Sequence, residues 1–208
     1  MIERIALRAG LASALFAAAL PALAGAQKEE QLSQSVVSGL AKAIADAPVP
    51  ANYASRPEVS RWISEMSRRI AHKVDTDRER TELLATTHYE SLRAGLDPQM
   101  VLAVMYHESG FKKYAFSSAQ ARGYMQVMPF WVKYIGTPDQ NLFNLRTNLR
   151  YGTVILRHYL DLEKGDLFRA LGRYNGSLGR AEYPNTVLQA WQGTWLYRVA
   201  GPHTASAM

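Results

Sequence analysis

The sequence contains no cysteine among its 208 residues. This absence excludes a disulfide framework, a thiolate metal site and an N-terminal lipidated cysteine. No segment of any length alternates apolar and polar residues as a β-strand does, and no internal repeat is visible. The five histidines do not form an H-E-x-x-H motif or another spacing typical of metal ligands. We therefore expect a mainly α-helical protein with no metal site and no cofactor.

Residues 1–26 have the organisation of a secretory signal peptide. Arg4 and Arg8 supply the positive charge, and residues 9–20 form an apolar stretch that is too short to span a bilayer comfortably. Two small-residue cleavage sites follow, one ending at Ala24 and one at Ala26, and the pattern leaves both open. We expect export to a bacterial periplasm without a stable membrane anchor; an uncleaved anchor is the alternative.

The chain is basic, with 24 Lys plus Arg against 18 Asp plus Glu. The basic residues are scattered rather than concentrated in one run, as on an ordinary solvated surface. For an exported protein, the polyanions within reach are cell-wall polymers and anionic membrane surfaces. No nucleic-acid partner is expected.

Apolar periodicity and capping residues predict helices throughout the remaining chain. The expected helices cover residues 27–47, 57–73, 76–94, 98–109, 130–135, 147–163, 167–174 and 184–195. In the third of these, Leu83, Leu84, Thr87 and Leu92 are expected to face inward. We divide the chain into a helical extension at 27–75, a main domain at 76–200 and a disordered tail at 201–208.

The segment from Met100 to Pro129 is the most informative part of the sequence. Asp97 and Pro98 precede it in N-cap and N1 positions, and seven apolar residues follow from Met100 to Tyr106. A helix that is apolar on all sides lies inside a domain. Gly110 is well placed to end this helix in a left-handed conformation.

Glu108 therefore stands in the last turn of a buried helix. The helix dipole and desolvation both disfavour negative charge there, so we expect a raised pKa and a carboxyl group suited to general-acid chemistry. An ion pair with an arginine, or a side chain that points into solvent, is the structural alternative.

Four groups of residues occur in an order that resembles the soluble lytic transglycosylases of the lysozyme-like superfamily, the family 1 or SLT type. They are Glu108-Ser109, Gly123-Tyr124-Met125-Gln126-Val127-Met128-Pro129, the pair of segments 141–145 and 149–152, and Tyr174-Asn175-Gly176. The resemblance covers roughly residues 85–195. It implies a lysozyme-like catalytic domain preceded by the N-terminal helical extension.

The resemblance also implies roles for individual residues. Glu108 would be the single catalytic acid and base, with Ser109 as a supporting hydrogen-bond donor. Gln126 would line the sugar-binding cleft, although satisfying buried backbone groups is its structural alternative. Tyr174 and Asn175 would lie opposite, and Tyr183 would be a further cleft aromatic; for Tyr174 a core position is an equal alternative.

One part of the chain departs from the family pattern. The loop usually written S-P-x-G-A-x-G is here Ser117-Ser118-Ala119-Gln120-Ala121-Arg122-Gly123, without the first proline and first glycine. Gln120 stands where a residue with positive φ is expected.

The family chemistry implies peptidoglycan glycan strands as substrate and a 1,6-anhydro-MurNAc product made without water. A goose-lysozyme-like hydrolase is one alternative. A non-catalytic wall-binding or assembly module is another, and an envelope-spanning secretion or cell-wall machine is a candidate partner.

Overall fold

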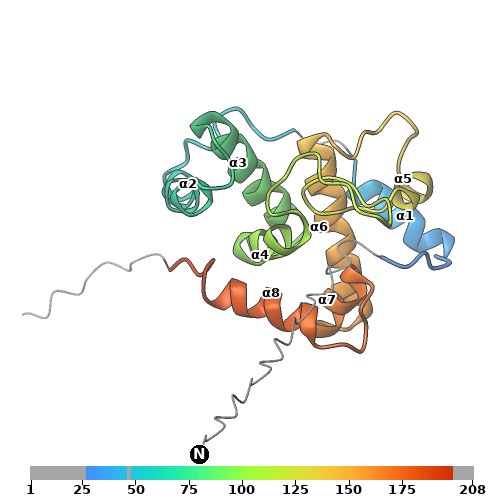
Figure 1. Cartoon of the computed structure of the whole chain (residues 1–208). Helices are drawn as coiled ribbons and strands as arrows, with labels where there is room; N and C mark the ends of the chain where they lie inside the picture. Colours follow the sequence, from blue (N-terminus) through green and yellow to red (C-terminus); the bar gives the residue numbers. More distant parts are fainter. Residues whose placement is uncertain (1–26, 46–47, 199–208) are drawn as a thin grey trace, which may run out of the picture.

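The computed structural model describes residues 27–45 and 48–198, which hold eight α-helices (Figure 1). The predicted signal peptide and the predicted tail at 201–208 lie outside the described residues. The helices are α1 (Gln34–Ala43), α2 (Pro57–Ile70), α3 (Asp77–Arg93), α4 (Pro98–Ser109), α5 (Phe130–Ile135), α6 (Leu145–Leu162), α7 (Leu167–Asn175) and α8 (Glu182–Gln192). Outside the helices, the described residues form two isolated antiparallel bridges but no named strand. The prediction of a mainly α protein is confirmed.

Helix α4 forms where its capping residues predict. The Asp97 carboxylate accepts a hydrogen bond from the Gln99 amide at 2.7 Å, and Pro98 occupies the first helical position. Gly110 ends the helix at φ 58°, a conformation that costs glycine little. Residues 100–105 are at most 3% exposed, so α4 lies in the core as expected.

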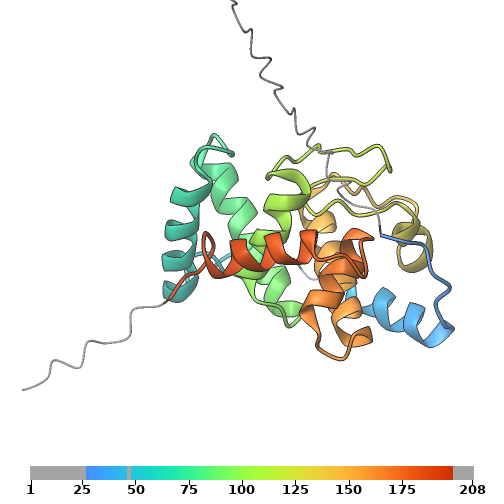
Figure 2. The same ribbon diagram turned by 60° about the horizontal axis from the view of Figure 1, so that its bottom comes forward.

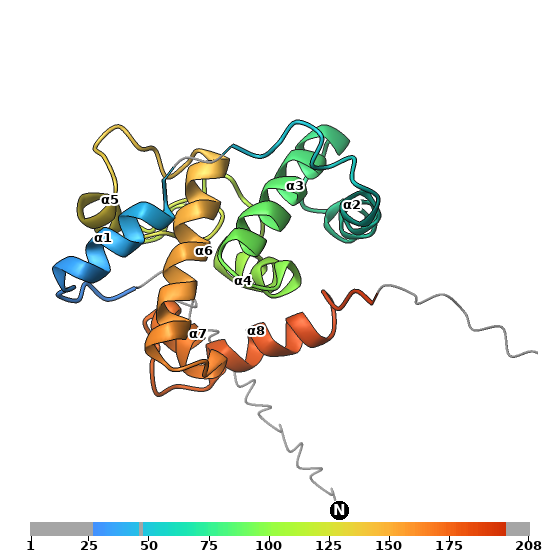
Figure 3. The ribbon, with the colours of Figure 1, turned by 180° about the vertical axis from the view of Figure 1, so that it is seen from behind.

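The other helices surround α4 and α6. Helices α2 and α3 lie at one end of the molecule, and α1 and α5 lie together at the other, with α6 between them (Figures 1 and 3). Helix α8 packs across α4 and contacts α7, which in turn packs on α6 (Figure 2). The chain segment between α4 and α5 lies against α6, to which Asn148 ties it.

A buried ion pair links α3 to α6. Glu90, which is 1% exposed, accepts hydrogen bonds from Arg150 at 3.0 Å and from Arg93 at 2.8 Å. Two guanidinium groups thus compensate the burial of this carboxylate.

Three predictions about the helices are wrong in detail. Residues 27–33 are not helical, because α1 starts only after Ser33, whose hydroxyl accepts a hydrogen bond from the Val36 amide. The last helix ends at Gln192 rather than at Trp195, and Trp195 instead buries its indole against Phe111.

Leu92 is the third correction, since its side chain is 55% exposed rather than turned inward. It follows Leu83 by nine residues, which places it about 180° away around an α-helix. Leu83, Leu84 and Thr87 are buried as predicted.

Candidate active site

Glu108 lies in the last turn of α4 with 5% of its surface exposed. The two acidic residues that are buried as whole residues in the described chain are Glu90 and Glu108. Glu90 is held by its two arginines, whereas Glu108 accepts a hydrogen bond from the Tyr183 hydroxyl at 2.6 Å. The hydrogen bond to Glu108 thus comes from a neutral hydroxyl of α8, whereas those to Glu90 come from two positively charged guanidinium groups.

Helix α8 contacts the end of α4 through two neighbouring residues of α4. Tyr183 reaches Glu108, and the backbone of Thr186 lies near His107. Burial lowers the pKa of His107, and the nearby Thr186 backbone offsets this only in part. His107 is thus held neutral near pH 7 beside the candidate acid.

Two tyrosines near Glu108, Tyr174 and Tyr183, donate hydrogen bonds and keep their phenolic protons. Burial raises the pKa of Tyr183 well above 10, and the negative charge of Glu108 raises it further. Burial and then the charge of Glu108 act in the same direction on the pKa of Tyr174. Both phenols consequently keep their protons over the pH range in which a carboxylic acid titrates.

The segment between α4 and α5 folds into a tight loop that returns beside α4. Arg122 pairs with Val127 through two backbone hydrogen bonds of 3.0 Å, which closes the turn that holds Gln126. Gln120 has φ 69° and Gln126 has φ 48°. Gln120 therefore adopts the positive φ expected where the family pattern has glycine, at the cost that this conformation carries for a residue with a Cβ.

Gln126 is 2% exposed, and its side chain points inward. Its Nε2 donates to the carbonyl of Ala115 at 3.1 Å and to that of Gly123 at 3.0 Å. These bonds correspond to the structural alternative that the sequence left open. A contact between Gln126 and a sugar stays a prediction.

Helices α6 and α7 both contact the segment between α4 and α5 at Met125. The Tyr174 hydroxyl donates to the Met125 carbonyl at 2.8 Å, and the Asn148 side chain accepts from the Met125 amide at 2.8 Å. A Cβ on Gly152 would come within 2.4 Å of the Met125 sulfur, so only glycine leaves room for this packing. Tyr174 is fully buried and acts on the site through Met125.

The remaining predicted site residues have less specific surroundings. The Ser109 hydroxyl donates to the Met105 carbonyl one turn earlier, at 3.2 Å. Asn175 is the last residue of α7 and is partly buried. The structure thus brings Glu108 and Tyr183 into contact and places Tyr174 and Gln126 on the two sides of Met125. The roles of Ser109 and Asn175 in binding stay predictions.

Sequence reasoning missed two residues that shape this region, Asn148 and Gln27. Asn148 is fully buried, and its Nδ2 also donates to the carbonyls of Arg122 and Leu142, each at 2.8 Å. The position of Asn148 next to the apolar face of a predicted helix could have indicated a buried amide with a structural role. Gln27, by contrast, stands in a polar stretch with no local feature that distinguishes it.

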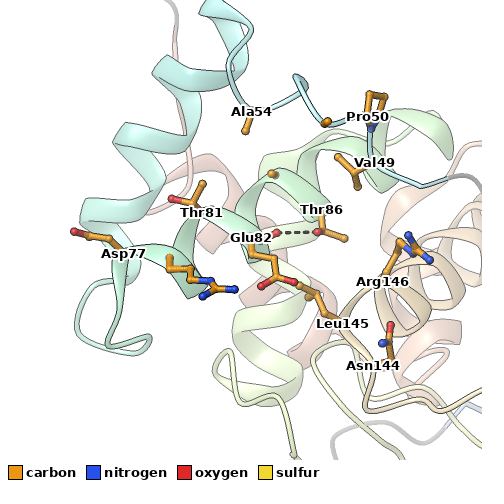
Figure 4. Close-up of a pocket in the computed structure, with 13 residues that line it drawn as sticks. Val49, Pro50, Ala54, Asp77, Thr81, Glu82, Thr86, Asn144, Leu145 and Arg146 are labelled. Atoms are coloured by element: carbon orange, nitrogen blue, oxygen red, sulfur yellow. Dashed lines mark hydrogen bonds between the residues drawn. The ribbon is translucent and has the colours of Figure 1, made fainter.

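A groove of about 870 Å³ lies between the segment 49–54, α3 and the start of α6 (Figure 4). Glu82 and Arg146 line it. None of the predicted site residues lines this groove.

Residues 27–45 and 48–198 contain no cluster of three or more His, Cys, Asp or Glu side chains that could hold a metal ion. None of the helices in that part of the chain is both long and apolar enough to cross a membrane.

Comparison with known proteins supports the importance of this region. Residues 86–187 match the family model described as "Transglycosylase SLT domain". A protein named "Transglycosylase" from Enterobacteria phage PRD1 is 33% identical over 106 residues, which cover 48% of this chain and 39% of the phage protein. The match thus spans about two fifths of that relative. No solved structure matches the chain.

Proposed function

We propose that this protein, whose residues 86–187 match the transglycosylase SLT domain family, is a lytic transglycosylase of bacterial peptidoglycan. It cleaves the β-1,4 bond between MurNAc and GlcNAc and leaves a 1,6-anhydro-MurNAc end. The enzyme is a carbon–oxygen lyase that needs no cofactor. It works in the periplasm after export through its N-terminal signal peptide.

The observation that carries this proposal is the environment of Glu108. It is a buried carboxyl group at the C-terminal end of α4, hydrogen-bonded to a tyrosine that keeps its proton. Burial and the helix terminus favour the neutral form of a carboxyl group, and a phenol donor favours the charged form. A group balanced in this way can donate a proton and then take one back, as a single acid–base residue must.

A single carboxyl group is enough only if the substrate supplies the nucleophile. Hydrolytic glycosidases use two carboxyl groups, the second as nucleophile or as base for water. Glu90, the other acidic residue buried as a whole in the described chain, is tied to Arg93 and Arg150 between α3 and α6. This pairing argues against Glu90 as a second catalytic carboxyl group, in line with a one-carboxylate reaction at Glu108.

The proposed reaction has two steps. Glu108 first protonates the glycosidic oxygen, so that the bond from that oxygen to C1 of MurNAc breaks while the acetamido group stabilises the cationic C1. The Glu108 carboxylate then removes the proton of the C6 hydroxyl, and O6 attacks C1 to close the anhydro ring. No water is consumed, and Glu108 ends protonated. Acid–base catalysis of this kind contributes about 10²–10⁴-fold to a rate.

Other residues of the site would hold the glycan or support the residues that do. Tyr183 orients Glu108, and Gln126, Met125 and Tyr174 fix the shape of the loop that is proposed to border the cleft. Ser109 and Asn175 are proposed as further binding residues at the ends of α4 and α7. An envelope-spanning secretion or cell-wall machine is the proposed setting in which glycan strands are cut.

Glu108→Gln is the direct test of this proposal. The amide has nearly the same shape but cannot donate the required proton, so anhydro-muropeptide release from purified sacculi should fall by at least 10²-fold. The matched control is Glu182→Gln, which makes the same change at an exposed acid next to Tyr183. Activity of Glu108→Gln within tenfold of wild type would contradict the assignment.

The products distinguish a lyase from a hydrolase. Digestion in ¹⁸O-labelled water should leave the new MurNAc terminus unlabelled, and mass spectrometry should find products one water lighter than those of lysozyme. Labelled reducing ends as the main product would establish the goose-lysozyme-like hydrolase instead. Wall binding without any cleavage by the wild-type protein would identify a non-catalytic module.

A further inference from the structure

The residues before α1 contact the loop that contains Gln126. Gln27 is only 3% exposed although it stands in a polar stretch, and it lies 99 residues before Gln126. In Figure 2 the segment that leads into α1 starts beside α5 and the loop preceding it. We define residues 27–30 as the N-terminal arm.

Gln27 uses both ends of its carboxamide on this loop. Its Nε2 donates to the carbonyl of Gln126 at 3.1 Å, and its Oε1 accepts from the amide of Met128 at 3.0 Å. These groups belong to residues i and i+2 of one chain, so the side chain pairs with them as a neighbouring strand would. A primary amide carries the donor and the acceptor that this pairing requires.

The rest of the arm contacts the helices on either side of that loop. Glu29 accepts a hydrogen bond from the Tyr134 hydroxyl of α5 at 2.6 Å. Glu30 accepts one from Arg173 of α7 at 3.1 Å. Arg173 directly precedes Tyr174, which holds the Met125 carbonyl. The arm therefore contacts the loop, α5 and α7, and α7 also holds the loop through Tyr174.

Gln126 needs such external support. Its φ of 48° is unfavourable for a residue with a side chain, and persists only where surrounding contacts impose it. Asn148 and Tyr174 secure Met125, on its N-terminal side. Gln27 secures the carbonyl of Gln126 itself and the amide two residues later.

We infer that Gln27 is a positioning residue of the glycan cleft, acting through the backbone of Gln126 and Met128. This inference rests on the proposed function, because it assigns the loop a role in holding glycan. Gln27 does not contact the reacting atoms; it keeps the loop in its strained, binding-competent form.

The test uses Gln27→Met in the full chain, because methionine keeps the length of the side chain and removes both hydrogen bonds. Gln31→Ala is the matched control, since Gln31 is an exposed glutamine of the same segment. Affinity for a soluble GlcNAc tetramer is measured by calorimetry in variants that also carry Glu108→Gln, so that no sugar is cleaved. Turnover of sacculi is measured in variants that retain Glu108. Exchange of the Met128 amide is followed by NMR in the same proteins.

Gln27→Met should weaken tetramer binding about tenfold, accelerate exchange of the Met128 amide and leave α4 protected. Gln31→Ala should change none of these. Unchanged exchange at Met128, or faster exchange with unchanged binding and turnover, would overturn the inference. Tighter binding or faster turnover would also overturn it, since the arm would then obstruct the cleft.

Gln27→Glu provides a second variant in case Gln27→Met folds poorly. In the charged form, the new glutamate still accepts a hydrogen bond from the Met128 amide, but it repels the carbonyl oxygen of Gln126. In the protonated form, its hydroxyl can donate a hydrogen bond to that carbonyl oxygen. In the Glu108→Gln background, its binding deficit relative to Gln27 should therefore shrink between pH 7.5 and pH 4.5. A pH-independent deficit would count against positioning through this bond.

The two proposals fail in different ways. A wild-type protein that neither binds the tetramer nor releases muropeptides would overturn the proposed function, and with it the role of Gln27 in glycan binding. Exchange at Met128 would still decide whether Gln27 holds the loop.

Discussion

At the scale of single residues, the contact between Tyr183 and Glu108 has the clearest chemical consequence. The phenol donates to the carboxyl group at 2.6 Å and keeps its own proton, because burial and the charge of Glu108 raise its pKa well above 10. A donor of this kind stabilises the carboxylate more than the neutral acid. Tyr183 thereby influences the pH at which Glu108 becomes unable to act as an acid.

Tyr183→Phe should move the alkaline limb of the pH–rate profile upward by about one to two pH units. A hydrogen bond to a charged group contributes roughly 1.5–3 kcal/mol, and one pKa unit corresponds to about 1.4 kcal/mol. The sign follows because the carboxylate loses stabilisation, so the acid stays protonated to higher pH. Turnover measured from pH 4 to pH 9 checks this shift.

Tyr106→Phe is the control, because Tyr106 lies on α4 but is 40% exposed. Its profile should coincide with that of wild type. A Tyr183→Phe profile that also coincides with wild type would show that the bond does not tune the acid.

At the scale of elements, the loop before α5 is held by α6 as well as by hydrogen bonds within the loop. Asn148 of α6 makes two hydrogen bonds to the backbone of this loop, at Arg122 and Met125, and a third to Leu142 between α5 and α6. Gly152, one turn further along α6, leaves the space that Met125 fills. The loop is therefore shaped in part by a helix that follows it in the sequence.

Asn148→Ala should lower the free energy of unfolding by roughly 2–4 kcal/mol, because it leaves buried backbone groups without partners. Activity should fall further than stability explains, since the Gln126 turn loses its attachment to α6. Urea unfolding and turnover at a temperature where the variant is fully folded separate the two effects. Asn52→Ala, at an exposed turn, should leave both unchanged; a stable and fully active Asn148→Ala would refute this role.

At the scale of the whole molecule, residues 27–75 share one hydrophobic core with the rest of the chain. Val59, Trp62, Ile63, Met66 and Ile70 of α2 are all at most 7% exposed, and α2 packs on α3. α1 contributes Leu40 and Ile44 to the same core. The division into an extension and a catalytic domain stays a prediction, and this packing suggests that the two parts depend on each other.

A protein that begins at Thr76 should consequently be less stable and less active than the full chain. It would expose the apolar faces of α3 and lose both the arm and its contact to Met128. Fully burying one large apolar side chain contributes about 1.5–3 kcal/mol, so losing several is comparable to the whole stability of a typical domain, about 5–15 kcal/mol. Thermal unfolding and sacculus turnover test this; full stability and activity of the shortened chain would show that the extension is dispensable.

Local residue patterns determined most helices and the position of the candidate acid. Asp97, Pro98 and Gly110 specify the ends of α4 through contacts within a turn, and an apolar run between them requires burial. These interactions involve neighbours in sequence, so they can be inferred without knowing the fold. The positive φ at Gln120 was accessible because the resembling family loop has glycine at that position.

Tertiary structure alone decided which residues meet around Glu108. Tyr183 lies 75 residues after it, and Gln27 reaches its partner across 99 residues. The local sequence of the N-terminal arm is compatible with a helix that continues into α1. Its side chains instead form hydrogen bonds with the loop, α5 and α7. Such contacts depend on how helices pack, and packing brings together residues whose local sequence carries no sign of the encounter.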